Sequence, residues 1–195
     1  MKRIGIVGDI GSGKSYVAYK FGYPVFNADL EVSKLYRFDK LCFKKLNKIL
    51  PKHILTFPIT KKQIISAIIE NNLNLRKIIK IIHPLIRKKM IRFLKKNKNK
   101  NVVVLDIPLF LENKINKKKD VIVFVDSKKK EITKRLKKRK NFNYELIKKF
   151  RNLQLPLDIK KKKSNFIIRN DFTNKTIKKN INKILKNILY ERSNT

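Results

Sequence analysis

The sequence has little of what would tie it to an oxidising compartment or to a membrane. It has a single cysteine, Cys42, so no internal disulfide can form and a reducing compartment is expected. No apolar run approaches the roughly 20 residues that a membrane-spanning helix needs. Because an apolar strand is expected to begin at Ile4, the start of the chain leaves no room for a signal peptide. We therefore expect a soluble cytoplasmic protein that contacts no membrane.

Acidic residues are also scarce, because 14 Asp and Glu stand against 51 Lys and Arg and give a formal charge of +37. Such an excess is typical of nucleic-acid-binding proteins. Here, however, the lysines are dispersed in pairs and short runs, without the interleaved aromatic residues that stack on RNA bases. Lysine, asparagine, isoleucine and phenylalanine all have A/T-rich codons, so base bias of a genome would also explain the excess. We expect weak, salt-dependent binding to polyanions and no specific nucleic-acid partner, with a basic nucleic-acid-binding protein as an alternative.

Glycine is rare, but three of the five glycines lie in one segment. Residues 8–15 read Gly-Asp-Ile-Gly-Ser-Gly-Lys-Ser, which fits the phosphate-binding P-loop, G-x-x-x-x-G-K-[ST]. The apolar residues 4–7 predict a buried strand before it, and residues 14–21 predict a helix after it, as this motif requires. The glycines let backbone N–H groups converge on phosphate oxygens, Lys14 would reach the β- and γ-phosphates, and the Ser15 hydroxyl would bind Mg²⁺. The segment therefore predicts a nucleoside triphosphate site.

Short apolar runs alternate with helical patterns along the chain. The expected strands are residues 4–7, 24–26, 102–105, 121–125 and 166–168. Their nearly continuous apolar character predicts a parallel sheet that is buried on both faces. The main helical patterns are residues 30–38, 75–94, 131–140 and 173–189. The alternation predicts one α/β domain, doubly wound, with core 1–38 and 99–195 and a helical insertion over about 39–98.

Two aspartates follow predicted strands. Asp29 comes after the second strand, at the edge of a parallel sheet where ligands bind. It could accept a proton from an attacking hydroxyl, or it could cap a helix that begins near Leu30. Asp106 closes the third strand, where it could hold Mg²⁺ or serve as a turn residue. The apolar loop over residues 107–112 carries one carboxylate, Glu112, and suits the rim of a substrate pocket.

Three cationic or titratable side chains are further candidates. His83 precedes Pro84, which we expect to kink or end the long helical pattern. A kink could aim the imidazole at the ligand crevice, although a lone histidine among isoleucines is often a core residue. Arg135 and Arg139 lie four residues apart on one helix face and could close over phosphates, or form a solvated face. The lysine run over residues 160–163 is expected to be solvated.

Taken together, these motifs resemble the dephospho-coenzyme A kinase family over nearly the whole chain, from Ile4 to about Ile188. Residues 4–15 are similar to the family's I-G-[LI]-T-G-G-I-G-S-G-K-S. Later family motifs are D-A-D, H-P-x-I, D-x-P-L-L-x-E, R-x-x-x-R, R-x-x-Q and K-x-x-x-A-D-x-V-I-x-N. The segments that resemble them are, in the same order, residues 27–29, 83–86, 106–112, 135–139, 151–154 and 160–170. The P-loop is common to many kinases, but the conjunction with the later motifs is more specific.

The resemblance implies a P-loop kinase core with a helical substrate-binding insertion and a mobile lid over about 135–160. It implies transfer of the γ-phosphate of ATP to the ribose 3′-hydroxyl of dephospho-CoA, with Mg²⁺ as cofactor. Asp29 would be the catalytic base, and Lys14, Arg135 and Arg139 would balance phosphate charge. The implied ATP-binding residues are Gly11, Ser12, Gly13, Lys14, Ser15, Tyr16, Arg139 and Asn170. The implied acceptor-binding residues are Asp29, His83, Pro108, Leu109 and Glu112. Mg²⁺ would be held by Ser15 and Asp106.

The chain departs from the family pattern at several positions. Asn27 replaces the first Asp of D-A-D, and Asp9 replaces the second loop glycine, which adds a negative side chain beside the phosphate site. Tyr16 stands where Thr is common, and Lys61 replaces an arginine and so removes a possible bidentate phosphate contact. These changes bear on affinity and rate more than on identity. A P-loop kinase for another nucleoside or nucleotide is the main alternative, and we expect a monomer or weak oligomer.

Overall fold

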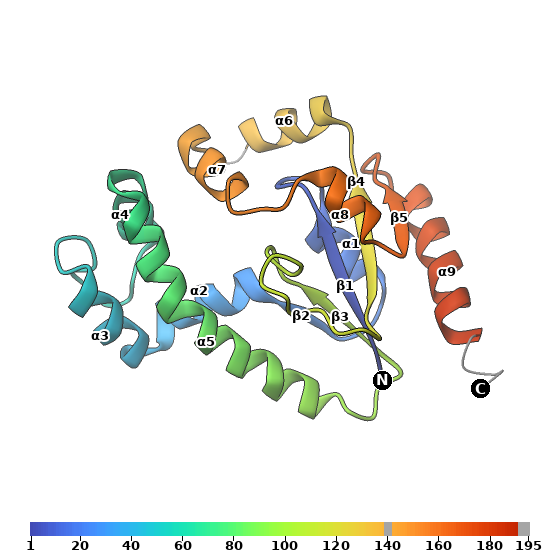
Figure 1. The fold of residues 1–195 in the computed structure, drawn as a ribbon, viewed down its shortest axis with the longest axis horizontal. Coiled ribbons are helices and arrows are strands. Elements are labelled where there is room, and N and C mark those ends of the chain that lie inside the picture. Colours follow the sequence, from blue (N-terminus) through green and yellow to red (C-terminus); the bar gives the residue numbers. More distant parts are fainter. Residues whose placement is uncertain (139–141, 191–195) are drawn as a thin grey trace. The chain divides into compact units, whose positions relative to one another are not determined.

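The computed structural model describes residues 1–138 and 142–190, and Figure 1 shows its helices and strands. The chain forms two compact units. The first comprises Met1–Asn27, Asn97–Phe142 and the chain from Arg151 onward, and the second comprises Ala28–Lys96 and Asn143–Phe150. The insertion expected over 39–98 falls almost entirely within the second unit. The segment expected to be a lid is divided between the two.

The first unit is built on a five-stranded sheet, which confirms the predicted α/β fold class. Its strands are β1 (Lys2–Gly8), β2 (Val25–Asn27), β3 (Val102–Asp106), β4 (Val121–Asp126) and β5 (Phe166–Arg169). They lie in the order β2-β3-β1-β4-β5, and all neighbours are parallel. In this register Gly8 pairs with Val125, and Asn27 pairs with Asp106. The loops that follow β1, β3 and β4 therefore leave the sheet at one edge.

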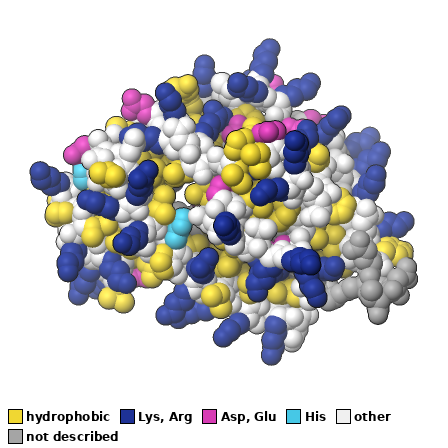
Figure 2. Space-filling view, in the orientation of Figure 1, with side chains coloured by type: hydrophobic (Ala, Val, Ile, Leu, Met, Phe, Trp, Pro, Cys, Tyr) yellow, Lys and Arg dark blue, Asp and Glu magenta, His cyan; other side chains and the backbone are white. Residues whose placement is uncertain are grey.

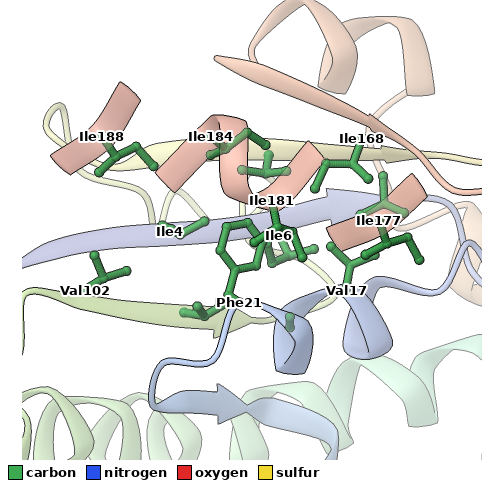
Figure 3. Close-up of a cluster of buried hydrophobic side chains, with 14 residues drawn as sticks. Ile4, Ile6, Val17, Phe21, Val102, Ile168, Ile177, Ile181, Ile184 and Ile188 are labelled. Atoms are coloured by element: carbon green, nitrogen blue, oxygen red, sulfur yellow. The ribbon is translucent and has the colours of Figure 1, made fainter. Parts of the chain in front are cut away.

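Helices of the first unit pack around this sheet. They are α1 (Lys14–Lys20), α6 (Lys129–Lys137), α8 (Leu157–Lys162) and α9 (Asn174–Tyr190). Of these, α1, α6 and α9 each bury apolar side chains. In α9 every third or fourth residue is a buried isoleucine, as the sequence pattern predicts, and the helix packs against α1 and β5. Figure 3 shows this stripe meeting Ile4 and Ile6 of β1, with Val17 and Phe21 from the region of α1. The core thereby holds β1, and the loop that follows it, in place.

The regular elements of the second unit are all helices among its described residues, and a loop over residues 50–60 connects two of them. It contains α2 (Ala28–Phe38), α3 (Lys40–Ile49), α4 (Lys61–Glu70), α5 (Asn72–Lys96) and most of α7 (Tyr144–Arg151). Side-chain hydrogen bonds are made at both ends of α4: Thr60 and Gln63 form a reciprocal capping box at its start, and Lys149 of α7 donates to the carbonyls of Ile68 and Ile69 near its end. In α3, burial raises the pKa of the Cys42 thiol to about 11, so this cysteine is an unreactive core residue.

Two expectations about local structure need correction. We expect Pro84 to kink or end the long helix; the ending is wrong, because α5 runs unbroken on both sides of the proline, and the kink stays a prediction. Buried residues at 78, 82, 86 and 90 continue one stripe past the proline, so tertiary packing outweighs the backbone hydrogen bond that proline removes. The second correction concerns the lysine run 160–163, expected to be solvated: Lys160 is only 1% exposed. Its side chain belongs to the site described below.

Lysine and arginine otherwise lie mainly at the surface. Figure 2 shows their side chains scattered among hydrophobic and neutral groups over the face in view, as a dispersed excess of lysine predicts. Among the described residues, no helix combines the length and the apolar character needed to cross a membrane.

Candidate functional site

The P-loop occupies the turn between β1 and α1, so the predicted strand, loop and helix are all found. Gly13 has a φ of 87°. A Cβ at this position would lie 2.4 Å from the side-chain nitrogen of Asn170. Gly8 ends β1, and a Cβ there would lie 2.6 Å from the carbonyl oxygen of Val125. Side chains are therefore excluded at both ends of the loop, because one needs a left-handed backbone and both are approached closely by neighbouring groups.

The loop is braced from the ends of β4 and β5. The Ser12 carbonyl accepts hydrogen bonds from Asn170 Nδ2 at 2.7 Å and from Ser127 Oγ at 2.9 Å. Asn170 is 3% exposed, and its Oδ1 accepts from the backbone N–H of Phe172 at 2.8 Å. The adenine contact implied for Asn170 stays a prediction, and the structure gives this side chain a bracing role. Ser127 was missed, although a small hydroxyl residue directly after a strand at this edge is a detectable signal.

Lys14 lies at the start of α1 with its ammonium group turned back over the loop. Its Nζ donates to the carbonyl of Asp9 at 2.7 Å and to that of Gly8 at 3.3 Å. Ser15 and Tyr16 follow in the first turn of α1 and are exposed, and the Tyr16 hydroxyl is hydrogen-bonded to Asn174. The Lys14 ammonium therefore lies against the backbone at the start of the P-loop.

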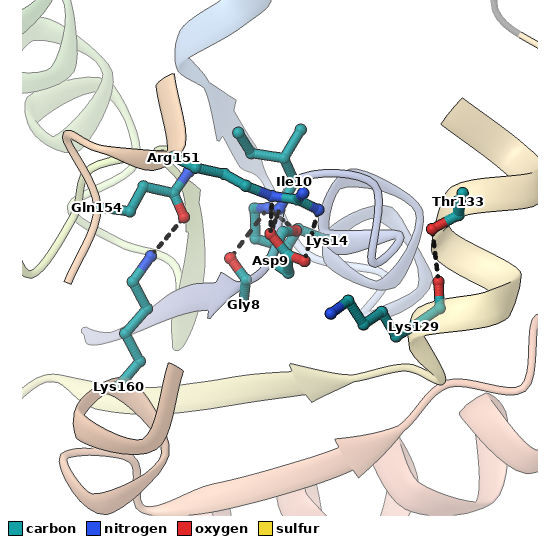
Figure 4. A network of polar contacts seen from close by, with 9 residues as sticks. All are labelled: Gly8, Asp9, Ile10, Lys14, Lys129, Thr133, Arg151, Gln154 and Lys160. Atoms are coloured by element: carbon teal, nitrogen blue, oxygen red, sulfur yellow. Dashed lines mark hydrogen bonds and ion pairs between the residues drawn. The ribbon is translucent and has the colours of Figure 1, made fainter. Parts of the chain in front are cut away.

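Asp9 stands where the family pattern has a glycine, so it adds a carboxylate to this loop. In the structure this carboxylate is paired with the cation of Arg151. Arg151 donates from Nη2 to Asp9 Oδ2 at 3.0 Å and from Nε to Oδ1 at 3.3 Å. Oδ1 also accepts from the backbone N–H of Ile10 at 2.6 Å. Figure 4 shows Arg151 reaching across to Asp9 beside Lys14. Two cations, Lys14 and Arg151, are therefore both anchored on Asp9, one on its carbonyl and one on its carboxylate.

A buried ion pair connects the segment after Arg151 to the loop after β3. Lys160 Nζ lies 2.8 Å from Glu112 Oε1 and 2.7 Å from the Gln154 side-chain oxygen. The same Glu112 oxygen accepts from the backbone N–H of Leu155 at 3.0 Å. The second carboxylate oxygen of Glu112 is buried and has no hydrogen-bond partner among the described residues. Of the other predicted acceptor contacts in this loop, Pro108 and Leu109 are partly exposed.

Asp106 closes β3 at the same edge of the sheet. It is 4% exposed, and its Oδ2 accepts a hydrogen bond from Asn27 Nδ2 at 2.7 Å. Asn27 thus supplies a neutral donor where the family motif has a second carboxylate. Arg135 lies on α6 with its guanidinium carbon 4.1 Å from the centre of the Phe172 ring, a cation–π contact. Arg139 lies outside the described residues.

Two predicted site residues, Asp29 and His83, belong to the second unit. Asp29 is the second residue of α2 and is exposed, and its backbone carbonyl accepts from the Ser33 hydroxyl at 3.0 Å. Since α2 begins at Ala28, Asp29 lies inside the first turn and is not the cap of a helix starting at Leu30. His83 is half-buried in α5, and burial together with the charge of Arg87 lowers the pKa of its imidazole. The imidazole is therefore neutral at pH 7.

Comparison with known proteins agrees with these features. A family model described as dephospho-CoA kinase matches residues 2–179. The Rickettsia bellii dephospho-CoA kinase is 33% identical over 192 residues, which cover 96% of this chain and 98% of that protein. A Wolbachia dephospho-CoA kinase is 33% identical over 113 residues, 55% of this chain and 58% of its own length, so this shorter match spans little more than half of that relative.

Solved structures support the same fold. The dephospho-CoA kinase from Campylobacter jejuni superposes with a TM-score of 0.62 at 21% identity, over 96% of this chain and 97% of that one. At this identity the likeness establishes the fold alone. The family model and the full-length Rickettsia relative go further, and they show that the chain belongs to the dephospho-CoA kinase family.

Proposed function

We propose that this chain transfers the γ-phosphoryl group of ATP to the ribose 3′-hydroxyl of dephospho-CoA, giving ADP and coenzyme A. The observation that supports this most directly is the P-loop, with Lys14 turned over its mouth, in a chain of this family. The Lys14 ammonium is held by two neutral carbonyl oxygens. Phosphate oxygens are charged acceptors and form stronger hydrogen bonds with a cation, so ATP would draw Lys14 from the carbonyls onto its β- and γ-phosphates.

Magnesium would enter with the nucleotide. Among the described residues no three His, Cys, Asp or Glu side chains gather into a metal site of their own. A P-loop site does not need such a cluster, because phosphates and water supply most of the ligands of Mg²⁺. The Asp106 carboxylate at the end of β3 and the Ser15 hydroxyl at the start of α1 are oxygen ligands of the type Mg²⁺ takes. In our proposal these two residues hold the ion, which neutralises charge on the transferred group.

The acceptor hydroxyl needs a group to take its proton. Asp29 follows the end of β2 by two residues and is exposed to solvent. We propose that this carboxylate accepts the 3′-hydroxyl proton while the ribose oxygen bonds to the γ-phosphorus. The bond from that phosphorus to the β–γ bridging oxygen breaks at the same time, and ADP leaves. Arg135 would balance the charge that develops during transfer.

A panel of acceptors tests the proposal. Purified protein with ATP and Mg²⁺ is incubated separately with dephospho-CoA, adenosine, AMP and CMP, and phosphorylated products are identified by mass spectrometry. We expect transfer only to dephospho-CoA, and none with Lys14→Ala, whose melting temperature should match the wild type. Phosphorylation of a nucleoside or monophosphate instead would reassign the acceptor. Absence of transfer to every acceptor would reject the kinase assignment for this chain.

A further inference from the structure

The carboxylate of Asp9 is an unexpected group in a phosphate-binding loop. Nucleotide phosphates are anionic, so a bare carboxylate beside them would repel them. Asp9 is not bare: its side chain is only 14% exposed and holds the guanidinium of Arg151 through two hydrogen bonds. The Asp9 carboxylate and the Arg151 guanidinium together carry no net charge. The guanidinium therefore offsets the repulsion that the carboxylate alone would exert on a phosphate.

The geometry of the pair leaves part of Arg151 for another ligand. A guanidinium carries five N–H donors. Asp9 engages Nε and Nη2, which together form one edge of the planar group. Among the described residues, Nη1 has no hydrogen-bond partner, and the Arg151 side chain is 40% exposed. The engaged edge fixes the plane of the guanidinium, so the remaining N–H groups have a set direction.

The position of Arg151 is also fixed from its C-terminal side. Arg151 is the last residue of α7, and its carbonyl accepts from the backbone N–H of Gln154 at 2.9 Å. The Gln154 side chain is in turn held by the buried Lys160. Asp9 therefore receives a cation whose backbone is anchored to the core, and the Lys14 ammonium on the Asp9 carbonyl lies beside it.

We propose that Asp9 and Arg151 form a phosphate-recognition pair, in which Asp9 is a positioning residue and the free edge of Arg151 binds a terminal phosphate of the nucleotide. This inference rests on the proposed ATP-dependent function. In the bound state Lys14 and Arg151 would contact the phosphates together, while Asp9 stays on the engaged edge of Arg151. Arginine is suited to this role because its planar group can serve two anions at once, whereas a lysine ammonium would have to divide its donors between them.

The direction in which nucleotide affinity changes when Asp9 is replaced separates this proposal from its alternatives. Removing the charge of Asp9 removes repulsion of phosphate, so electrostatics alone predicts tighter nucleotide binding by Asp9→Asn. A purely structural ion pair predicts unchanged affinity and a lower melting temperature. The positioning role predicts weaker binding, because Arg151 loses its orientation. Asp9→Asn keeps an oxygen for the Ile10 N–H, so the local turn is preserved, and Asp9→Ala removes both contacts.

The test measures binding of ATP and of inorganic tripolyphosphate by calorimetry, with Mg²⁺ and without acceptor. We expect Arg151→Gln and Asp9→Ala each to weaken both ligands by about tenfold or more, with a smaller loss of the same sign for Asp9→Asn. Arg151→Lys should not restore the affinity. The double variant Asp9→Ala with Arg151→Gln should bind no more weakly than Arg151→Gln alone, since both changes remove one interaction. Tripolyphosphate isolates the phosphate contacts from those to adenine.

Lys161→Gln is the matched control, because Lys161 is a similarly exposed cation in a surface ion pair with Asp126 of the first unit. Its affinity should stay within about twofold of wild type, as expected for an exposed pair. Tighter or unchanged binding by the Asp9 variants, or losses that add in the double variant, would overturn the inference. Failure of the wild type to bind ATP would instead reject the proposed function, so the two failures are distinguishable.

Discussion

Replacing Lys160 by methionine should strongly destabilise the first unit, because it removes the cation from a buried ion pair. The Lys160 side chain is 1% exposed and that of Glu112 is 9% exposed, and their charged atoms lie 2.8 Å apart. Methionine has a similar length and keeps the packing of the aliphatic stem. Among the described residues, the change leaves the Glu112 carboxylate buried with one backbone donor, Leu155, to its Oε1 and no donor to its Oε2.

The magnitude follows from the uncompensated charge. Breaking a buried pair from one side costs about 3–5 kcal/mol of the free energy of unfolding. In a chain of this size each kcal/mol lowers the melting temperature by about 2–4 °C, so the expected decrease is about 6–20 °C. A second substitution, Glu112→Gln in the Lys160→Met background, removes the stranded charge. It should therefore recover part of the loss, because a neutral amide costs less to bury than an unpaired carboxylate.

Urea denaturation and thermal melting of the three variants measure these differences. Lys161→Met is the matched control: it is the next residue of α8, its side chain is 49% exposed, and its ion pair with Asp126 is 3.4 Å long. Its change should stay below about 1 kcal/mol. The reasoning is refuted if Lys160→Met and Lys161→Met are equally stable, or if the double variant is less stable than Lys160→Met alone.

Three further predictions concern function. Arg135→Lys should lower kcat, because lysine keeps the charge but loses the planar group that lies over Phe172. Steady-state kinetics measure this change, and a wild-type kcat would mean that Arg135 has no role in transfer. Asp29→Asn should lower kcat by roughly 10²–10⁴-fold with little change in ATP affinity or melting temperature, and an unchanged kcat would remove Asp29 as the base. Binding to duplex DNA should be weak and lost near physiological salt in a filter-binding titration, whereas a sequence-preferring complex that persists there would contradict a dispersed charge.

The sheet and the P-loop could be predicted because their signals are local. Each strand is a continuous apolar run, and the loop motif spans eight consecutive residues between a strand and a helix. The order of the strands, β2-β3-β1-β4-β5, was not predicted and comes from the structure. The helical stripe of α9 was equally local, since its buried isoleucines recur at helical spacing within one segment.

The contacts that complete the candidate site could not be predicted in this way. Lys160 stands in a run of four lysines, and nothing in the run distinguishes it from Lys161. The burial of Lys160 depends on its ion pair with Glu112, which lies 48 residues earlier in the chain. The partner of Asp9 is 142 residues distant. Pairing at such separations is decided by the fold, not by the neighbouring sequence, which is why a charge run was interpreted as solvent-exposed when one member is buried.

Two departures from the family pattern have a joint consequence for charge at this edge of the sheet. Asn27 removes a carboxylate beside Asp106, and Asp9 adds one beside Arg151, so the two substitutions together leave the number of carboxylates unchanged. The Asn27 donor lies 2.7 Å from Asp106 Oδ2. An aspartate in that place would bring two carboxylates into contact and favour a shared proton. The Asn27 amide instead donates a hydrogen bond to the Asp106 carboxylate. The carboxylate added at Asp9 is matched by a guanidinium, so neither departure leaves an unpaired charge where the phosphates of ATP would lie.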